Sequence, residues 1–144
     1  TWDELFTFTI VRNPWDRVLS MYFYRRRKGS IPDTWSFTDF VLQLENPEPG
    51  SGYFRYHGHR LGAADYVLDG EGAFLVDHII RYEDRESGLR LAREKCHFED
   101  LGRLRIQHAT PEKTRYADHY DDHTRDVIAR LYARDIDLFN YQFA

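Results

Sequence analysis

Two side chains eight residues apart, Arg12 and Ser20, have the types and spacing that most clearly point to chemistry. Arg12 follows an apolar run typical of a strand, and Asn13-Pro14 then marks the start of a helix. A guanidinium binds phosphate through two hydrogen bonds, the N-terminal end of a helix favours anions, and a hydroxyl adds a neutral hydrogen bond. The pattern predicts an anion site at the end of the strand. The alternative is an ordinary strand-turn-helix with Arg12 in a surface ion pair.

Two histidines, His57 and His59, fall within the stretch 46–60, which is rich in glycine and proline and predicts a long loop. Imidazole titrates near neutral pH, so either histidine is a candidate general base. The alternative is a pair of loop histidines with no special role.

Metal ligation is the other chemistry that histidine spacing suggests. His57 with His59, and His119 with His123, have spacings that could chelate a metal. Both pairs lie in polar surroundings, and Cys96 is the chain's single cysteine, which excludes a cysteine-based zinc site and an internal disulfide. We expect no metal.

The densest positive run covers residues 25–28, three arginines and a lysine. One interpretation is that its field attracts an anionic substrate. The other is a solvated helix end whose cations complement the helix dipole.

The elements that must position these residues follow from hydrophobic periodicity and from helix start and stop signals. Alternating strands and helices predict an α/β layer with a parallel sheet, in a single domain over residues 1–144. A strand at 5–11 is expected to be buried on both faces. The other expected elements are helices at 14–27, 36–42, 86–96 and 121–139 and a strand at 74–80.

Composition bears on two functions, nucleic-acid binding and membrane association. The 144 residues carry a formal net charge of −4, which argues against a general nucleic-acid binder. No apolar run approaches the roughly 20 residues that span a membrane, so membrane association is not visible. The chain leads at once into an apolar strand, and we expect it to be a piece of a longer protein.

Residues 10–22 resemble a known motif, the 3′-phosphate-binding motif of sulfotransferases that use 3′-phosphoadenosine 5′-phosphosulfate (PAPS). That motif has an arginine, Asn-Pro, an aromatic, an acidic residue, an arginine, and a serine eight residues after the first arginine. Residues 65–70, 76–84, 116–120, 124–127 and 131–143 are similar to further segments of the carbohydrate-type branch, family 2. The resemblance covers nearly the whole chain.

The resemblance implies a P-loop-kinase-like parallel sheet flanked by helices, truncated at the N-terminus. It implies that Arg12 and Ser20 bind the 3′-phosphate and that Lys113 and Arg115 are secondary phosphate ligands. PAPS would be the donor and adenosine 3′,5′-bisphosphate (PAP) the product, with no metal. The family's lysine-containing loop for the 5′-phosphosulfate is absent from this sequence, which leaves activity of the chain alone open.

The implied reaction is sulfuryl transfer to a hydroxyl, or less readily an amine, of a carbohydrate-like acceptor, with His59 or His57 near the attacking oxygen. The family's Pro-Gln after the histidine is missing here. Two alternatives are a non-catalytic module that binds a 3′-phosphoadenosine nucleotide and a P-loop nucleotide kinase. Localisation is not determined: the cytoplasm for a bacterial member, or the Golgi lumen for a eukaryotic one whose N-terminal anchor is missing.

Overall fold

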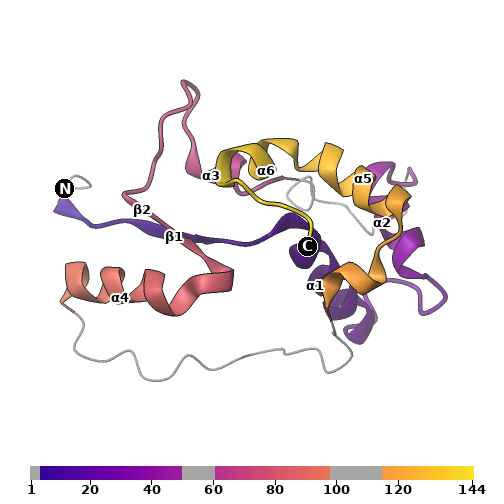
Figure 1. The fold of residues 1–144 in the computed structure, drawn as a ribbon. Coiled ribbons are helices and arrows are strands. Elements are labelled where there is room, and N and C mark those ends of the chain that lie inside the picture. The colour runs from indigo at the N-terminus through magenta and orange to yellow at the C-terminus, as the bar shows by residue number, and fades with distance from the viewer. Residues whose placement is uncertain (1–3, 50–60, 98–114) are drawn as a thin grey trace. The chain divides into compact units, whose positions relative to one another are not determined.

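Two strands and several helices make up the described residues, in agreement with the α/β class that the sequence predicts (Figure 1). The structure is a computed structural model that describes residues 4–49, 61–97 and 115–144. None of the described helices has the length and apolarity needed to cross a membrane. The elements in chain order are β1 (Phe8–Val11), α1 (Pro14–Arg27), α2 (Phe37–Glu45), α3 (Ala64–Val67), β2 (His78–Arg81), the 3₁₀ turn η3 (Tyr82–Asp84), α4 (Arg85–Cys96), the 3₁₀ turn η4 (Tyr116–His119), α5 (Asp122–Leu131) and α6 (Ala133–Phe139).

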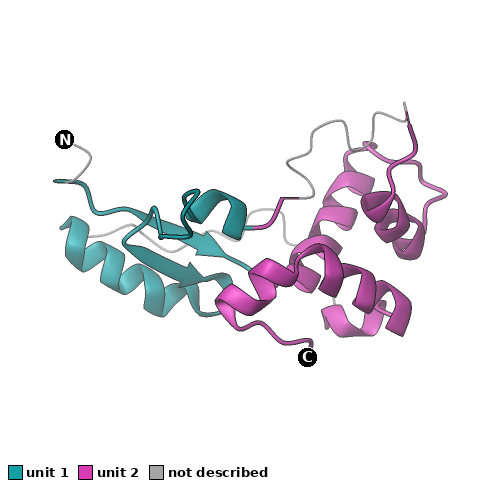
Figure 2. Ribbon diagram, turned by 90° about the horizontal axis from the view of Figure 1, so that it is seen from above, with its two compact units in different colours: residues 1–12, 63–107 teal, residues 13–62, 108–144 magenta. Residues whose placement is uncertain are grey.

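The chain divides into two compact units (Figure 2). The first unit holds Thr1–Arg12 with Ala63–Gln107, and the second holds Asn13–Gly62 with His108–Ala144. Arg12 is therefore the last residue of one segment, and Asn13 begins the next.

The first unit is built on a parallel pair of strands, as the sequence predicted. Phe8 pairs with His78 and Val11 with Arg81, so both strands end at the same edge. Helix α4 packs on β2. Gly88 of α4 permits this approach, because a Cβ there would overlap the side chain of Ile80. The small core of this unit consists of Ile80, Leu89 and Ala92, with Phe6 packed against it.

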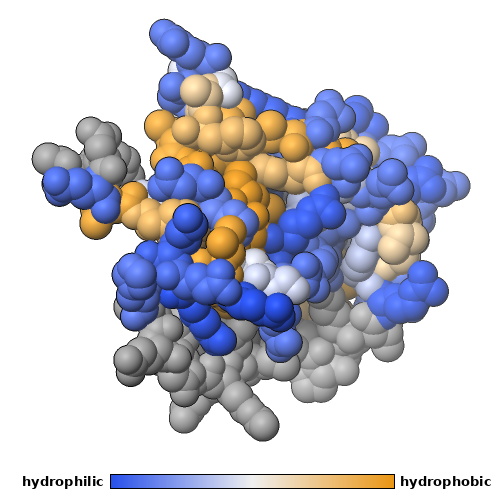
Figure 3. Space-filling view, turned by 60° about the vertical axis from the view of Figure 1, so that its left-hand side comes forward, coloured by the Kyte–Doolittle hydropathy of each residue, from blue (hydrophilic) through white to orange (hydrophobic). Residues whose placement is uncertain are grey.

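The expectation that the first strand is buried on both faces is wrong. Phe8 is 38% exposed and Ile10 is 46% exposed, while Val11 is buried. In the described residues β1 pairs only with β2, and α4 packs on β2. Figure 3 shows hydrophobic residues gathered on one face of the molecule and bordered by hydrophilic ones. The second strand is also shorter than predicted and begins at His78.

The second unit is a helical layer around the buried stripe of α1. Helix α1 contacts α2, α5 and η4, and α5 also contacts α2 and α6. The helical spacing of Trp15, Val18, Leu19, Tyr22 and Phe23 predicts one apolar stripe on α1. The first four are at most 4% exposed, which confirms the stripe, and Phe23 is half-buried. Helix α2 begins at a capping box in which Ser36 and Asp39 exchange hydrogen bonds. The residues that fill this core from the other helices are Phe40, Val41, Leu44, Val127 and Ile128.

The late helix predicted over residues 121–139 is wrong as one element. It is interrupted at Tyr132, whose backbone (φ −119°, ψ 28°) leaves the helical region and separates α5 from α6. The sequence has no glycine or proline there to announce the break. The Tyr132 side chain is 2% exposed, so the interruption coincides with a buried aromatic ring.

Candidate functional site

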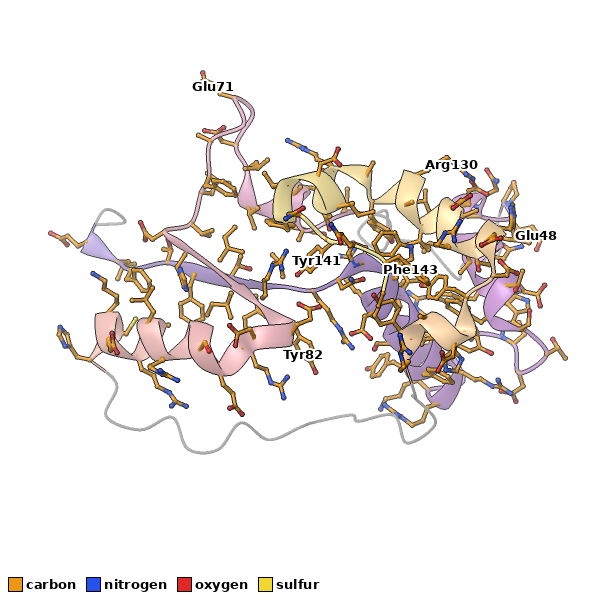
Figure 4. All side chains as sticks on the ribbon, in the orientation of Figure 1. Glu48, Glu71, Tyr82, Arg130, Tyr141 and Phe143 are labelled. Atoms are coloured by element: carbon orange, nitrogen blue, oxygen red, sulfur yellow. The ribbon has the colours of Figure 1, made fainter. Side chains whose placement is uncertain are left out.

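The parallel register of the first unit positions Arg12. Val11 and Arg81 are the last paired residues of the two strands, and Arg12 and Tyr82 are the residues that follow them. Neighbouring positions after the ends of parallel strands lie side by side, which is the edge where α/β sheets bind ligands. The Arg12 guanidinium accordingly lies over the Tyr82 ring, its central carbon 4.4 Å from the ring centroid. Figure 4 shows Tyr82 at this edge of the sheet.

A second arginine shares that ring. Arg85 is the first residue of α4, and its guanidinium carbon lies 4.9 Å from the Tyr82 centroid. Its Nη1 also donates to the Tyr82 carbonyl at 3.3 Å. The sequence analysis placed the end of the second strand just before residues 81–84 and assigned no role to Tyr82 or Arg85. The signal that could have found them is the parallel pairing itself, because it brings the residues after both strands together.

The start of α1 is held by Asn13, as the sequence predicted. Its Oδ1 accepts from the backbone N–H groups of Trp15 (3.1 Å) and Asp16 (3.4 Å), and Pro14 takes the first helical position. The Asn13 carbonyl accepts from the Arg17 N–H at 2.8 Å. These N–H groups therefore already have partners within the chain. The helix start therefore acts on an anion through the dipole of the helix, as the sequence analysis expected, while these N–H groups bond to Asn13.

Side chains from distant parts of the second unit lock this helix start in place. Asn13 Nδ2 donates to the Gln142 carbonyl at 3.1 Å. The Tyr120 hydroxyl donates to the Trp15 carbonyl at 2.8 Å, and the Phe143 ring meets Trp15 edge-on with centroids 5.5 Å apart. Figure 4 labels Phe143 near the end of the chain. Burial, followed by the charges of nearby groups, raises the pKa of Tyr120 far above its ordinary value, so this hydroxyl remains a donor.

Ser20 lies at the end of the second turn of α1 and is half-buried. It belongs to the second unit and Arg12 to the first, and each is described within its own unit.

The other arginine of the motif, Arg17, contacts residues of its own unit. Its guanidinium lies over the ring of Tyr132 at 4.6 Å, and its Nη2 donates to the Leu61 carbonyl at 3.2 Å. The two motif arginines thus differ: Arg12 stands at a strand end, while Arg17 fastens helix α1 to two other segments of its unit.

Of the remaining predicted site residues, Arg115 is the one that lies within the described residues. His57, His59 and Lys113 lie outside the described residues. Arg115 is exposed and precedes η4, and its carbonyl accepts from the Asp118 N–H at 3.1 Å. Its role as a phosphate ligand stays a prediction.

The proposed histidine pair at 119 and 123 does not form one helical face. His119 closes η4, where its ring meets Phe23 edge-on at 5.5 Å, and His123 lies in α5. The intervening Tyr120 and Asp121 are extended, so the i, i+4 geometry is lost. Within residues 4–49, 61–97 and 115–144, no group of three or more His, Cys, Asp or Glu side chains could hold a metal ion.

Comparison with known protein families identifies the family of this chain. Residues 2–142 match the family described as "Sulfotransferase family", which covers nearly the whole chain. No curated protein and no solved structure matches the chain. The matched range includes β1, the Arg12 to Ser20 segment and the arginine pair around Tyr82.

Proposed function

Since the chain belongs to the sulfotransferase family, we propose that it transfers a sulfuryl group from PAPS to a hydroxyl of a carbohydrate-like acceptor. The family implies PAPS as the donor in general terms, and the acceptor class is our own inference. The observation that carries the proposal is Arg12 at the carboxyl end of β1, within a segment that has the motif's order of residue types. A bidentate arginine at such an edge suits the dianionic 3′-phosphate that distinguishes PAPS from simpler nucleotides.

The donor set fits this ligand chemically. Arg12 supplies a planar fork of N–H donors, and Ser20 supplies a hydroxyl eight residues later on α1. The dipole of α1 adds a favourable potential for an anion near its first turn. Arg115, with Lys113, would add cations from the segment before η4.

The reaction is an in-line displacement at sulfur. The acceptor oxygen forms a new bond to sulfur as the bond between sulfur and the bridging phosphate oxygen breaks, and PAP leaves with the electron pair. The proton of the acceptor hydroxyl passes to a base, for which His59 or His57 is our candidate. Arg12 and Ser20 hold the donor through its 3′-phosphate, away from the bond that breaks, and so provide orientation.

The basic end of α1 supports an anionic acceptor. The last-turn carbonyls of Tyr24, Arg25 and Arg26 already accept backbone N–H groups, so the arginine side chains are not needed to cap the helix. Among the described ion pairs, none involves Arg26, Arg27 or Lys28.

Aromatic contacts hold two of these cations in place. Arg26 Nη1 donates to the Tyr22 hydroxyl at 2.9 Å, and that hydroxyl donates to the Trp35 carbonyl at 3.0 Å. The Arg27 guanidinium carbon lies 5.9 Å from the centroid of Tyr24, which is itself 44% exposed. An aromatic ring restricts a guanidinium without neutralising it. We therefore assign a uronate-bearing or sulfated sugar to this surface.

Calorimetry with the two nucleotides tests the donor site. PAP is expected to bind more tightly than adenosine 5′-monophosphate, and Arg12→Ala to weaken PAP by about 2 kcal/mol, the scale of a lost charged hydrogen bond. The monophosphate should be little affected, because it lacks the 3′-phosphate. Equal binding of both nucleotides by the unaltered chain would rule out the donor assignment. Binding of PAP without transfer of radiolabelled sulfur from PAPS to any acceptor would favour a non-catalytic module.

A further inference from the structure

The site around Tyr82 contains two cations. Arg12 and Arg85 come from different elements, the end of β1 and the start of α4, yet both guanidinium carbons lie within 5 Å of one ring centroid, at 4.4 and 4.9 Å. Tyr82 and both arginines are half-buried. The two guanidinium carbons are therefore no farther apart than the sum of these two distances, and an anion that contacts both groups would be attracted by two positive charges.

The ring is suited to positioning rather than to neutralising the arginines. A cation–π contact uses the face of the guanidinium, whereas a phosphate binds through the N–H groups at its edge. An arginine can therefore be held by an aromatic ring and bind a phosphate at the same time. The backbone bond from Arg85 Nη1 to the Tyr82 carbonyl, 3.3 Å long, further restricts the second arginine.

We propose that Tyr82 is a positioning residue for Arg12 and that Arg85 is a second cation of the same phosphate site. The proposal rests on the donor assignment made above and adds to it the residues that orient the 3′-phosphate. A phosphate monoester carries between one and two negative charges near neutral pH, which two arginines match better than one. All three side chains belong to the first unit, so the contacts among them are described within it.

The test is the ratio of the dissociation constants of adenosine 5′-monophosphate and PAP, measured by calorimetry on the whole chain. Tyr82→Phe keeps the ring and is expected to keep the ratio. Tyr82→Leu removes the ring and is expected to lower the ratio by roughly tenfold, the scale of a desolvated cation–π contact. Arg85→Gln is expected to lower it by about tenfold, the scale of a charged hydrogen bond, and to reduce the salt dependence of PAP binding.

A matched control is Arg90→Gln, an exposed arginine of the same helix, which should leave the ratio unchanged. If Tyr82→Leu weakens both nucleotides equally, the ring serves the nucleotide as a whole and the positioning role is refuted. If Arg85→Gln behaves like Arg90→Gln, the second-cation role is refuted. Should Tyr82→Leu fail to fold by circular dichroism, the comparison of Arg85→Gln with Arg90→Gln still decides that second role.

The outcome for Arg12 separates this proposal from the one on which it rests. A ratio that falls in Arg12→Ala but not in Tyr82→Leu or Arg85→Gln overturns only the inference made here. If Arg12→Ala leaves the ratio of the two dissociation constants unchanged, the assignment of the donor site itself is overturned.

Discussion

The guanidinium of Arg17 lies over the ring of Tyr132, with its central carbon 4.6 Å from the centroid. Tyr132 is 2% exposed and stands at the interruption between α5 and α6, so this contact joins α1 to the point where the late helical segment bends. The same arginine reaches the Leu61 carbonyl at 3.2 Å. Arg17 therefore ties together three segments of the second unit that are far apart in the sequence.

Arg17→Ala is expected to destabilise the chain without changing nucleotide selectivity. Losing a partly buried cation–π contact and a charged hydrogen bond should lower the free energy of unfolding by about 2 kcal/mol, measured by urea denaturation. The preference for PAP over adenosine 5′-monophosphate should remain that of the unaltered chain. A loss of preference equal to that of Arg12→Ala would show instead that Arg17 contacts the phosphate.

Gly62→Ala tests a close contact inside the second unit. A Cβ at Gly62 would overlap the carboxylate of Asp135, which is 2% exposed. Because the buried carboxylate has little room to move, we expect a loss of about 1–3 kcal/mol in the free energy of unfolding. Gly70→Ala is the matched control, since a Cβ there meets nothing within 4 Å. Equal stability of the two variants would contradict the packing described.

The Asp121 cap predicts an acid-sensitive contribution to stability. The backbone N–H and the hydroxyl of Thr124 both donate to the Asp121 carboxylate at 2.7 Å, and these bonds lower the pKa of Asp121. A folded pKa below the unfolded value of about 3.9 means that the contribution is complete above that value. It is lost as the pH falls through the lower, folded pKa.

Asp121→Ala should therefore cost roughly 1 kcal/mol near pH 7, the usual value of an N-cap, and clearly less near pH 2. Thermal denaturation across this pH range measures the difference. Asp137→Ala, at an exposed position of α6, is the matched control, because it also removes a carboxylate. A constant difference for Asp121→Ala at both pH values would refute the ionic part of the cap.

The basic end of α1 is expected to govern binding of an anionic polysaccharide. Replacing Arg26, Arg27 and Lys28 together by Gln should weaken binding of a sulfated polysaccharide by roughly tenfold at low salt, with a smaller effect at high salt. The double variant Arg90→Gln with Lys95→Gln removes exposed positive charge from α4 and serves as the control. Equal weakening in both variants would indicate a non-specific effect of net charge.

Removal of metal ions is expected to change nothing. Because the sequence leads us to expect no metal, EDTA should leave both the melting temperature and the calorimetric affinity for PAP unaltered. A melting temperature that falls on chelation and recovers with zinc would instead support a histidine site at positions 57 and 59 or 119 and 123.

The sequence by itself determined the elements whose causes are local. Helix α1 begins at Asn13-Pro14 and α2 at Ser36 because their caps bond to backbone groups within three residues, which a reader of the sequence can recognise. The apolar spacing of α1 can likewise be recognised in the sequence. The resemblance that singled out Arg12 and Ser20 also comes from residue order alone, and the family match confirms the family.

Only the tertiary structure decided the exposure of β1, the break at Tyr132 and the grouping of Arg12 and Arg85 around Tyr82. Each depends on segments that are distant in the chain: which strand pairs with β1, what packs on a buried ring, and which residues follow two strands in register. Such contacts arise from long-range pairing and burial, which leave no short-range signal in a single sequence. The motif therefore identified the arginine, and the parallel register identified its neighbours.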